Sequence, residues 1–187
     1  MKRRKPQLPV ILTVGHSNRS IADFIPLLKA HGIARVIDVR TIPRSRHNPQ
    51  FNCDALAKSL RAARIAYTHL KKLGGLRHAR ADSPNTGWHN ASFRGFADYM
   101  QTPEFAAGLK RVESLARTKR CALMCAEAVP WRCHRSLLAD ALVVRGHPVA
   151  HIMTRTRANP HKLTPFARVR GTRILYPASR LTWPRKP

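Results

Sequence analysis

The chain alternates short apolar runs with longer segments in which apolar side chains recur at helical spacing. Each run is followed by polar residues, Gly or Pro, and several runs are rich in β-branched side chains. Runs of this length and composition predict β-strands. The predicted strands span residues 10–14, 33–40, 66–70, 121–125 and 147–153.

The segments between these strands predict helices. Ser20 and Asn52 are suited to cap the first two helices, and Gly32 and Gly146 are suited to end helices. Pro26 is expected to delay or bend the first helix. A long polar loop is predicted after residue 70, because residues 71–95 show no periodicity. The predicted helices span residues 21–32, 53–65, 96–100, 103–117 and 133–145.

Alternating strands and helices predict an α/β fold with a mostly parallel central sheet and helices on both faces. A chain of 187 residues is most simply one domain with a substantial core. We assign residues 1–153 to this domain. Residues 154–187 are basic and contain several prolines, so we expect an extension that packs on the domain or trails from it.

Ligands of parallel α/β sheets bind beyond the carboxyl ends of the strands. Polar segments leave three of the predicted strands at that edge: GHSNRS, RTIPRSRHNPQFN and AEAVPWRCHR. The loop after residue 70 leaves at the same edge. The sequence therefore predicts that residues far apart in the chain meet in one electropositive hollow at this edge.

The charge balance suggests an anionic partner. Lys and Arg number 35 against nine Asp and Glu, a formal net charge of +26. Such a surface attracts nucleic acid or a phosphorylated small molecule, although a general coat of arginine is an alternative. No apolar run is long enough to span a membrane, and the basic start of the chain precedes only a short apolar stretch. We therefore expect a cytoplasmic protein whose cysteines are free thiols or metal ligands.

The densest group of reactive side chains follows the fourth predicted strand. Glu127, Cys133 and His134 are the candidate catalytic residues, with Glu127 or His134 as general acid or base and Cys133 as a nucleophile or polarising group. Cys125 and Arg135 complete the group. In the alternative interpretation Cys125 is a buried apolar residue, Glu127 pairs with an arginine, and His134 lies on the surface.

Other polar segments supply candidate ligand-binding residues. The turn after the first strand could hold an anion or could be an ordinary helix cap. Asp38, inside an apolar strand, needs a partner such as Arg40 or His16. The further glycines of a dinucleotide fingerprint are missing, so we expect no nicotinamide cofactor, and the sequence identifies no other. The candidates are His16, Ser17, Asn18, Arg19, Asp38, Arg40, Arg44, Ser45, Arg46, Gly74, Gly75, Cys125 and Arg135.

The order of these motifs resembles the domain-of-unknown-function 488 family. The segments that carry the resemblance are TVGHSNRSIADFIPLL, VIDVRTIPRSRHNPQFN, LGGLR, FADYMQTPEF, ALMCAEAVPWRCHRSLLADAL, HIM, and the tail HKLTPFARV and LYP. The resemblance implies a single Rossmann-like domain and no established reaction. By this resemblance, the motif residues here are Gly15, His16, Ser17, Asp38, Arg40, Pro43, Ser45, Arg46, Gly74, Gly75, Met124, Cys125, Glu127, Cys133, His134 and Arg135.

Three functions fit the residues. The first is an enzyme that acts on a phosphorylated ligand, a nucleotide or a nucleic acid. The second is a non-catalytic nucleic-acid-binding protein whose basic ends carry the affinity. The third is a metal-dependent or redox sensor built on Cys125, Cys133 and His134, with His16 or His69. This spacing lacks the short Cys-x2-Cys pair of most structural zinc sites, so we assign no metal.

Overall fold

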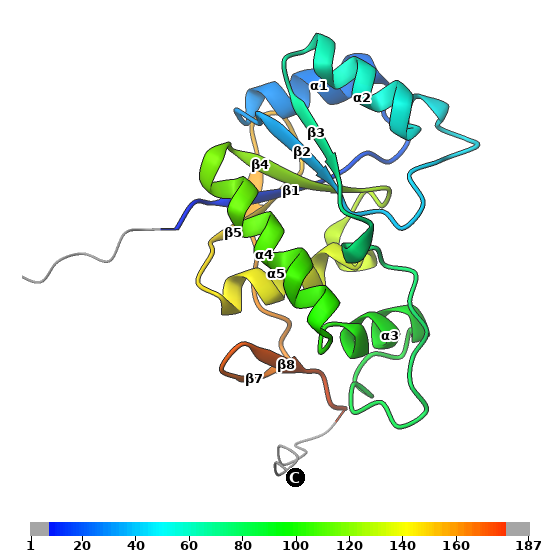
Figure 1. Ribbon diagram of the computed structural model, residues 1–187, viewed down its shortest axis with the longest axis vertical. Coiled ribbons are helices and arrows are strands. Elements are labelled where there is room, and N and C mark those ends of the chain that lie inside the picture. The colour runs from blue at the N-terminus through cyan, green and yellow to red at the C-terminus, as the bar shows by residue number, and fades with distance from the viewer. Residues whose placement is uncertain (1–7, 179–187) are drawn as a thin grey trace, which may run out of the picture.

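The computed structural model describes residues 8–178 and contains a six-stranded sheet (Figure 1). The strand order is β3-β2-β4-β1-β5-β6, and all neighbours are parallel except β5 and β6. The predicted leader before residue 8 lies outside the described residues. The strands are β1 (Ile11–Gly15), β2 (Arg35–Asp38), β3 (Ala66–His69), β4 (Cys121–Cys125), β5 (Val149–Ile152) and β6 (Ala158–Pro160).

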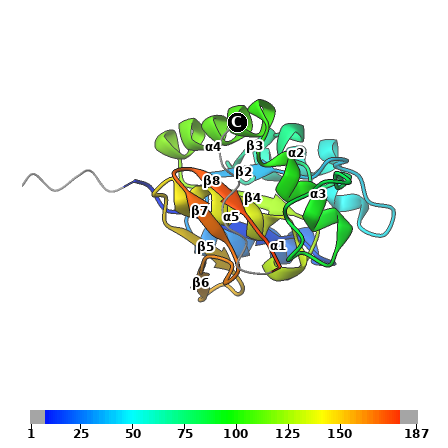
Figure 2. The same ribbon diagram turned by 90° about the horizontal axis from the view of Figure 1, so that it is seen from below.

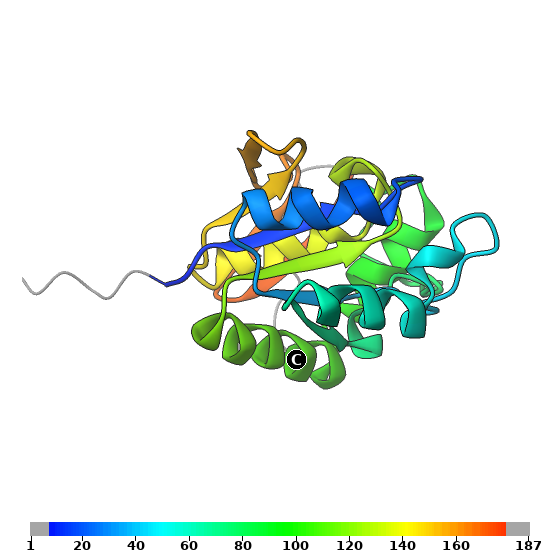
Figure 3. The ribbon, with the colours of Figure 1, turned by 90° about the horizontal axis from the view of Figure 1, so that it is seen from above.

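Helices cover both faces of this sheet, and an apolar core lies between the sheet and the helices on each face. The helices α1 (Ile21–Ala30) and α2 (Cys53–Ala62) bury Phe24 and Leu56 against one face (Figure 3). The opposite face carries α3 (Ala91–Tyr99), α4 (Pro103–Thr118) and α5 (Arg135–Val144) (Figure 2). The predicted α/β fold with a mostly parallel sheet and helices on both faces is therefore confirmed.

The chain order explains where the polar loops lie. Each parallel strand enters from the same side, so the segments after β1, β2, β3 and β4 all leave at one edge. These segments contain short 3-10 turns: η1 (Pro49–Phe51), η2 (Lys71–Leu73) and η3 (Pro130–Arg132). Main-chain bonds from His16 N to Cys125 O (2.9 Å) and from Ser17 N to Ala126 O (2.8 Å) continue the ladder beyond the strands.

The third helix begins earlier than the sequence predicts. It starts at Ala91 rather than Phe96, and the side chain of Asn90 caps it by accepting from Ser92 N and Phe93 N. The sequence does not predict the first turns of this helix because they include Gly95, and glycine is unfavourable inside a helix. Here a Cβ at Gly95 would lie 2.5 Å from Arg77 O, so the glycine lets the preceding loop pass against the helix.

Two predicted helix starts also need correction. The helix predicted from Cys133 begins at Arg135, because Cys133 is extended (φ −135°, ψ 143°) and closes the turn η3. Asn52 stands at the N-cap of α2, but its side chain does not bond to the helix. Its Oδ1 instead accepts from Ser45 N (2.8 Å), which folds the loop after β2 back on itself.

The chain after residue 153 is described as far as residue 178. It adds β6 to the sheet edge and forms a hairpin of β7 (Arg168–Arg170) and β8 (Arg173–Leu175). Ile174 and Tyr176 join the core beneath α5. The division into a domain and an extension stays a prediction, and residues 179–187 lie outside the described part. Among residues 8–178 no helix has the length and apolar character to cross a membrane.

Candidate functional site

A pocket of about 340 Å³ opens at the carboxyl edge of the sheet. Its walls come from all four loops that leave this edge and from the first turn of α3. The predicted residues that line it are His16, Arg40, Arg44, Ser45, Gly75, Cys125, Glu127, Cys133 and His134; Thr41, Ile42, Leu76, Ser92, Phe93, Ala126 and Arg132 line it as well.

A buried ion pair lies beneath one wall of this pocket. Asp38, fully buried at the end of β2, accepts from Arg40 Nη2 (2.6 Å), Arg40 Nε and Tyr67 Oη. Arg40 Nη1 faces His16 Nε2 at 3.2 Å. Burial and the Arg40 cation lower the pKa of His16 to about 4, so this imidazole is neutral. The guanidinium of Arg40 is therefore held inside the fold rather than free for a ligand.

Arg135 forms a second internal clamp. Its guanidinium is almost completely buried and donates to Cys133 Sγ (3.4 Å), Thr13 Oγ1 (3.2 Å) and the main-chain oxygen of Glu127 (2.6 Å). These bonds tie the start of α5 to β1 and to the loop after β4. Like Arg40, Arg135 shapes the site from within.

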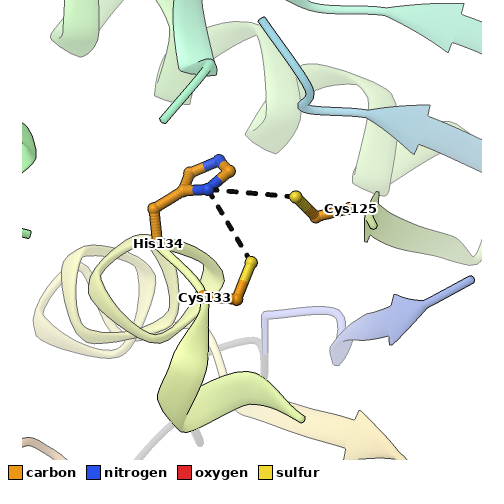
Figure 4. A group of neighbouring side chains, drawn as sticks. All are labelled: Cys125, Cys133 and His134. Carbon is orange, nitrogen blue, oxygen red and sulfur yellow. Dashed lines mark hydrogen bonds between the residues drawn. The ribbon is translucent and has the colours of Figure 1, made fainter. Parts of the chain in front are cut away.

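Two thiols and one imidazole converge at the inner end of the pocket (Figure 4). His134 Nδ1 lies 3.7 Å from Cys133 Sγ and 3.9 Å from Cys125 Sγ. The other ring nitrogen, Nε2, lies 3.1 Å from the main-chain oxygens of Val39 and Leu73. Since carbonyl oxygens only accept, Nε2 carries a proton, and Nδ1 is the ring nitrogen turned toward the two sulfurs.

The pKa values of the two thiols are shifted in opposite directions. A hydrogen bond from Cys125 lowers the pKa of Cys133, and His134 and Arg135 lower it further. The pKa of Cys125 is raised, first by that same bond and then by burial. Cys133 is therefore the sulfur of the pair favoured as thiolate, with Cys125 as its hydrogen-bond donor, and thiolate is the nucleophilic form of cysteine.

Free charges stand at the outer rim of the pocket. Arg44 and Arg132 are exposed lining residues with no side-chain partner among residues 8–178. Glu127 is also exposed, and its carboxylate contacts no cation in the described part of the chain; only its main-chain oxygen meets Arg135. The pair between Glu127 and an arginine, which was the alternative interpretation of this residue, is therefore not formed among the described residues. The rim presents two cations and one carboxylate to a ligand.

Several predicted ligand-binding residues do not line the pocket. In the turn after β1, only His16 lines the pocket. The main-chain N–H groups of His16 and Ser17 donate to Cys125 O and Ala126 O, so they are not free to bind an anion. Arg19 donates to the main-chain oxygen of Gly15 (2.6 Å), which holds the turn. The remaining predicted residues outside the lining are Asn18, Asp38, Arg46, Gly74 and Arg135.

Sequence reasoning missed a hydrogen-bonded chain that leads away from the thiols. Thr13 Oγ1 meets His151 Nδ1 (2.7 Å), His151 Nε2 meets His161 Nδ1 (2.9 Å), and His161 Nε2 meets Asp140 Oδ1 (2.7 Å). Arg135 can only donate at one end of this chain, and the Asp140 carboxylate accepts at the other. Burial lowers the pKa of His151 to about 4, so this imidazole is neutral. Because these residues lie far apart in sequence, no local motif signals the chain.

Cys125, Cys133 and His134 could also hold a soft metal ion. Their ligand atoms lie within 4.8 Å of one another, and the Nε2 contacts to main-chain oxygens orient the imidazole as a metal ligand would be. The electrostatic surroundings oppose this. Arg135 contacts Cys133, two further arginines stand at the rim, and the one carboxylate among the described lining residues is exposed. These surroundings favour an anion over a cation.

Gly75 sets the position of the imidazole. A Cβ at this residue would overlap His134 Nδ1 and lie 2.7 Å from its Cγ. We expect Gly75→Ala to displace the ring from the thiols and to slow alkylation of Cys133 about tenfold at pH 6, since the supported thiolate fraction falls. Mass spectrometry of the alkylated residue measures this rate.

Gly32→Ala provides the control for this change. Gly32 has a φ of 64°, so alanine there costs about 1 kcal/mol, but its Cβ would meet no atom closer than 3.6 Å. This variant should lose stability and keep the alkylation rate of the wild type. Equal rates in Gly75→Ala and wild type would show that the imidazole does not support the thiolate.

The comparisons with known proteins concern the same part of the chain. The model of a family described as a domain of unknown function, DUF488, matches residues 20–142, well over half of the chain. No curated protein and no solved structure matches this chain. The matched residues include the loop after β2, the glycines near Gly75 and the whole Cys125–Arg135 cluster. The chain therefore belongs to the DUF488 family.

Proposed function

We propose that this protein is an enzyme that acts on a phosphorylated ligand through the thiolate of Cys133. One observation carries the proposal: at the inner end of an open pocket, Cys133 receives hydrogen bonds that lower its pKa, while unpaired arginines stand at the rim. A structural cysteine in an apolar core needs no such support. The reducing cytoplasm, where free thiols persist, is the compartment we propose for it.

The rim supports the choice of an anionic ligand. Arg44 and Arg132 come from the loops after β2 and β4, so their guanidinium groups can approach one phosphate from two sides. Arginine forks bind phosphate oxygens in pairs, whereas a neutral ligand would leave these cations without partners. Of the anion contacts that the sequence suggested, Arg40 and Arg135 are bonded within the fold and Arg46 lies outside the pocket lining, so the proposed anion contacts are Arg44 and Arg132.

The reaction that suits this geometry is nucleophilic group transfer. The Cys133 sulfur donates an electron pair to an electrophilic carbon of the ligand, and the bond from that carbon to its leaving group breaks. The leaving group departs with the bonding electrons and takes a proton from His134, which has accepted the thiol proton at Nδ1. Glu127, at the rim, is placed to accept a proton from the water or alcohol that later displaces sulfur.

Alkylation by iodoacetamide tests the thiolate directly. We expect Cys133 to react at pH 6 at least tenfold faster than the half-exposed Cys53, because the lowered pKa keeps thiolate present below the usual cysteine range of about 8.5. The rate should fall only when the pH drops through the lowered pKa of Cys133. Residue-resolved mass spectrometry over pH 5–9 provides the measurement.

Protection by inorganic phosphate tests the anion site in the same assay. Millimolar phosphate should slow alkylation of Cys133, and Arg44→Gln and Arg132→Gln should each remove this protection. Arg46→Gln is the matched control, because Arg46 lies in the same loop and is exposed but does not line the pocket. An ordinary pH profile for Cys133, together with no protection by phosphate, would refute the proposed function.

Metal binding is the second candidate, favoured by the three donor atoms within 4.8 Å of one another. It predicts about one zinc ion per purified chain by elemental analysis and loss of that zinc in His134→Ala. It also predicts that chelation speeds alkylation of Cys133, since a metal would shield the sulfur. The enzyme proposal predicts no such effect, so the two functions separate in one experiment.

A further inference from the structure

A second pocket of about 440 Å³ lies across η3 from the first. Pro130 and Trp131 line the second pocket, whereas Arg132 and Cys133, which follow them directly, line the first. The pockets are linked again by two aromatic rings. Trp88 of the second pocket contacts Phe93 of the first, with ring centroids 4.8 Å apart. The two pockets therefore lie on either side of η3 and of this pair of rings.

The second pocket offers a platform for a flat ring. Trp131 is 64% exposed, an unusual position for the largest apolar side chain. Trp88 and Phe166 also line this pocket, with their ring centroids 5.0 Å apart. The ring of Tyr176 packs on Trp88, with centroids 5.6 Å apart. Held in this cluster, Trp88 and Phe166 are rigid, whereas Trp131 is free to stack on a ligand.

The polar groups of this pocket are mainly donors. Lys162 is exposed at its rim without a side-chain partner among the described residues. The Oδ1 of Asn159 already accepts from Arg157 Nε (2.8 Å), so its amide N–H groups remain for a ligand. His151 and His161 use their ring nitrogens within the buried chain described above. No carboxylate is found among the described residues that line the pocket.

We propose that the second pocket binds one base of a single-stranded nucleic acid whose backbone crosses η3 into the first pocket. The base stacks on Trp131, the amide of Asn159 donates to its carbonyl edge, and Lys162 meets the adjoining phosphate. The next phosphate lies with Arg132 and Arg44. This inference rests on the proposed function for the anion site of the first pocket and specifies its ligand.

Charge distinguishes a nucleic acid from a peptide as the occupant. A net charge of +26 favours a polyanion with one phosphate per residue, and aromatic platforms beside cations are how proteins hold single strands without sequence preference. An acidic peptide would satisfy the cations but would present no flat ring for Trp131. The aromatic wall and the cationic rim together fit a stacked base with its phosphate.

Fluorescence anisotropy with labelled twelve-nucleotide dT and U strands tests this proposal on the full-length protein. We expect Trp131→Ala to weaken binding about tenfold and Trp131→Phe to retain most of the affinity, because both rings stack. Lys162→Ala should flatten the plot of log affinity against log salt by about 0.7, the contribution of one contact with a single strand.

Two control variants separate the pocket from general surface effects. Val169→Ala shortens an exposed apolar side chain outside the pocket, and Lys110→Ala removes a charge from α4. Neither should change the affinity or the salt dependence measurably. Wild-type affinity in Trp131→Ala would overturn the proposal, as would equal competition by poly-glutamate and unlabelled dT strands for the protein.

The same assay distinguishes this inference from the proposed function. Anisotropy measures strand binding alone, because stacking and phosphate contacts do not need the thiolate, whereas alkylation measures the reactivity of Cys133. If Cys133 proves unreactive but Trp131→Ala loses affinity, the chemistry fails and the binding site stands. If Cys133 reacts as expected but Trp131→Ala binds normally, the proposed reaction stands and the proposed binding site fails.

Discussion

Asp38→Asn is expected to lower the free energy of unfolding by about 3–5 kcal/mol, the cost of leaving a buried charge without its counter-ion. Asp38 is fully buried, and its carboxylate accepts from the side chain and the amide of Arg40 and from Tyr67. The asparagine amide would turn a donor group toward Arg40, whose guanidinium is almost completely buried. Urea unfolding followed by circular dichroism measures the loss.

Asp82→Asn is the matched control for this prediction. Asp82 pairs with Arg80 at 2.6 Å, the same distance as Asp38 with Arg40, but its side chain is 71% exposed. Water and salt screen such a pair, so the urea midpoint should not move. If both variants unfolded at the wild-type midpoint, burial would not account for the strength of the Asp38–Arg40 pair.

Arg135→Met is expected to affect both stability and chemistry. Methionine fills much of the volume but leaves Thr13 Oγ1 and the main-chain oxygen of Glu127 without their donor, a cost of roughly 2–4 kcal/mol. It also removes a cation that lowers the pKa of Cys133. Alkylation of Cys133 at pH 6 should therefore slow at least tenfold, since each unit of pKa changes the thiolate fraction tenfold.

Arg111→Met removes an arginine without these contacts and serves as the control. Arg111 is exposed on α4. Its replacement should leave the urea midpoint and the alkylation rate unchanged. Loss of stability in Arg135→Met without slower alkylation would mean that the guanidinium holds the fold together but does not support the thiolate.

The strands were the most predictable part of the molecule. The strand 121–125 was predicted with its observed bounds, because a short apolar run buried on both faces has a strong local signal. The start of α3 was missed for the opposite reason. Gly95 and the polar residues around it look like a loop, and only the close approach of the chain near Arg77 requires a glycine inside the helix.

The candidate site was predictable in its location but not in the roles of its cations. The sequence placed the Cys125–Arg135 cluster and the loop after β2 at one edge, because parallel strands bring their carboxyl ends together. Nothing in the sequence distinguishes the roles of Arg40 and Arg135 from those of Arg44 and Arg132. The fold separates them, since the first two are clamped below the pocket and the last two face it.

Sequence by itself determined the α/β class, the family and the edge of the sheet at which polar loops gather, because these follow from local periodicity and from the order of motifs along the chain. Tertiary structure decided the opposite pKa shifts of the two thiols, the hydrogen-bonded His151–His161 chain and the pair of pockets flanking η3. Hydrogen-bond partners and burial set these properties. Both depend on residues more than a hundred positions apart, such as Thr13 and His151, which no local pattern relates.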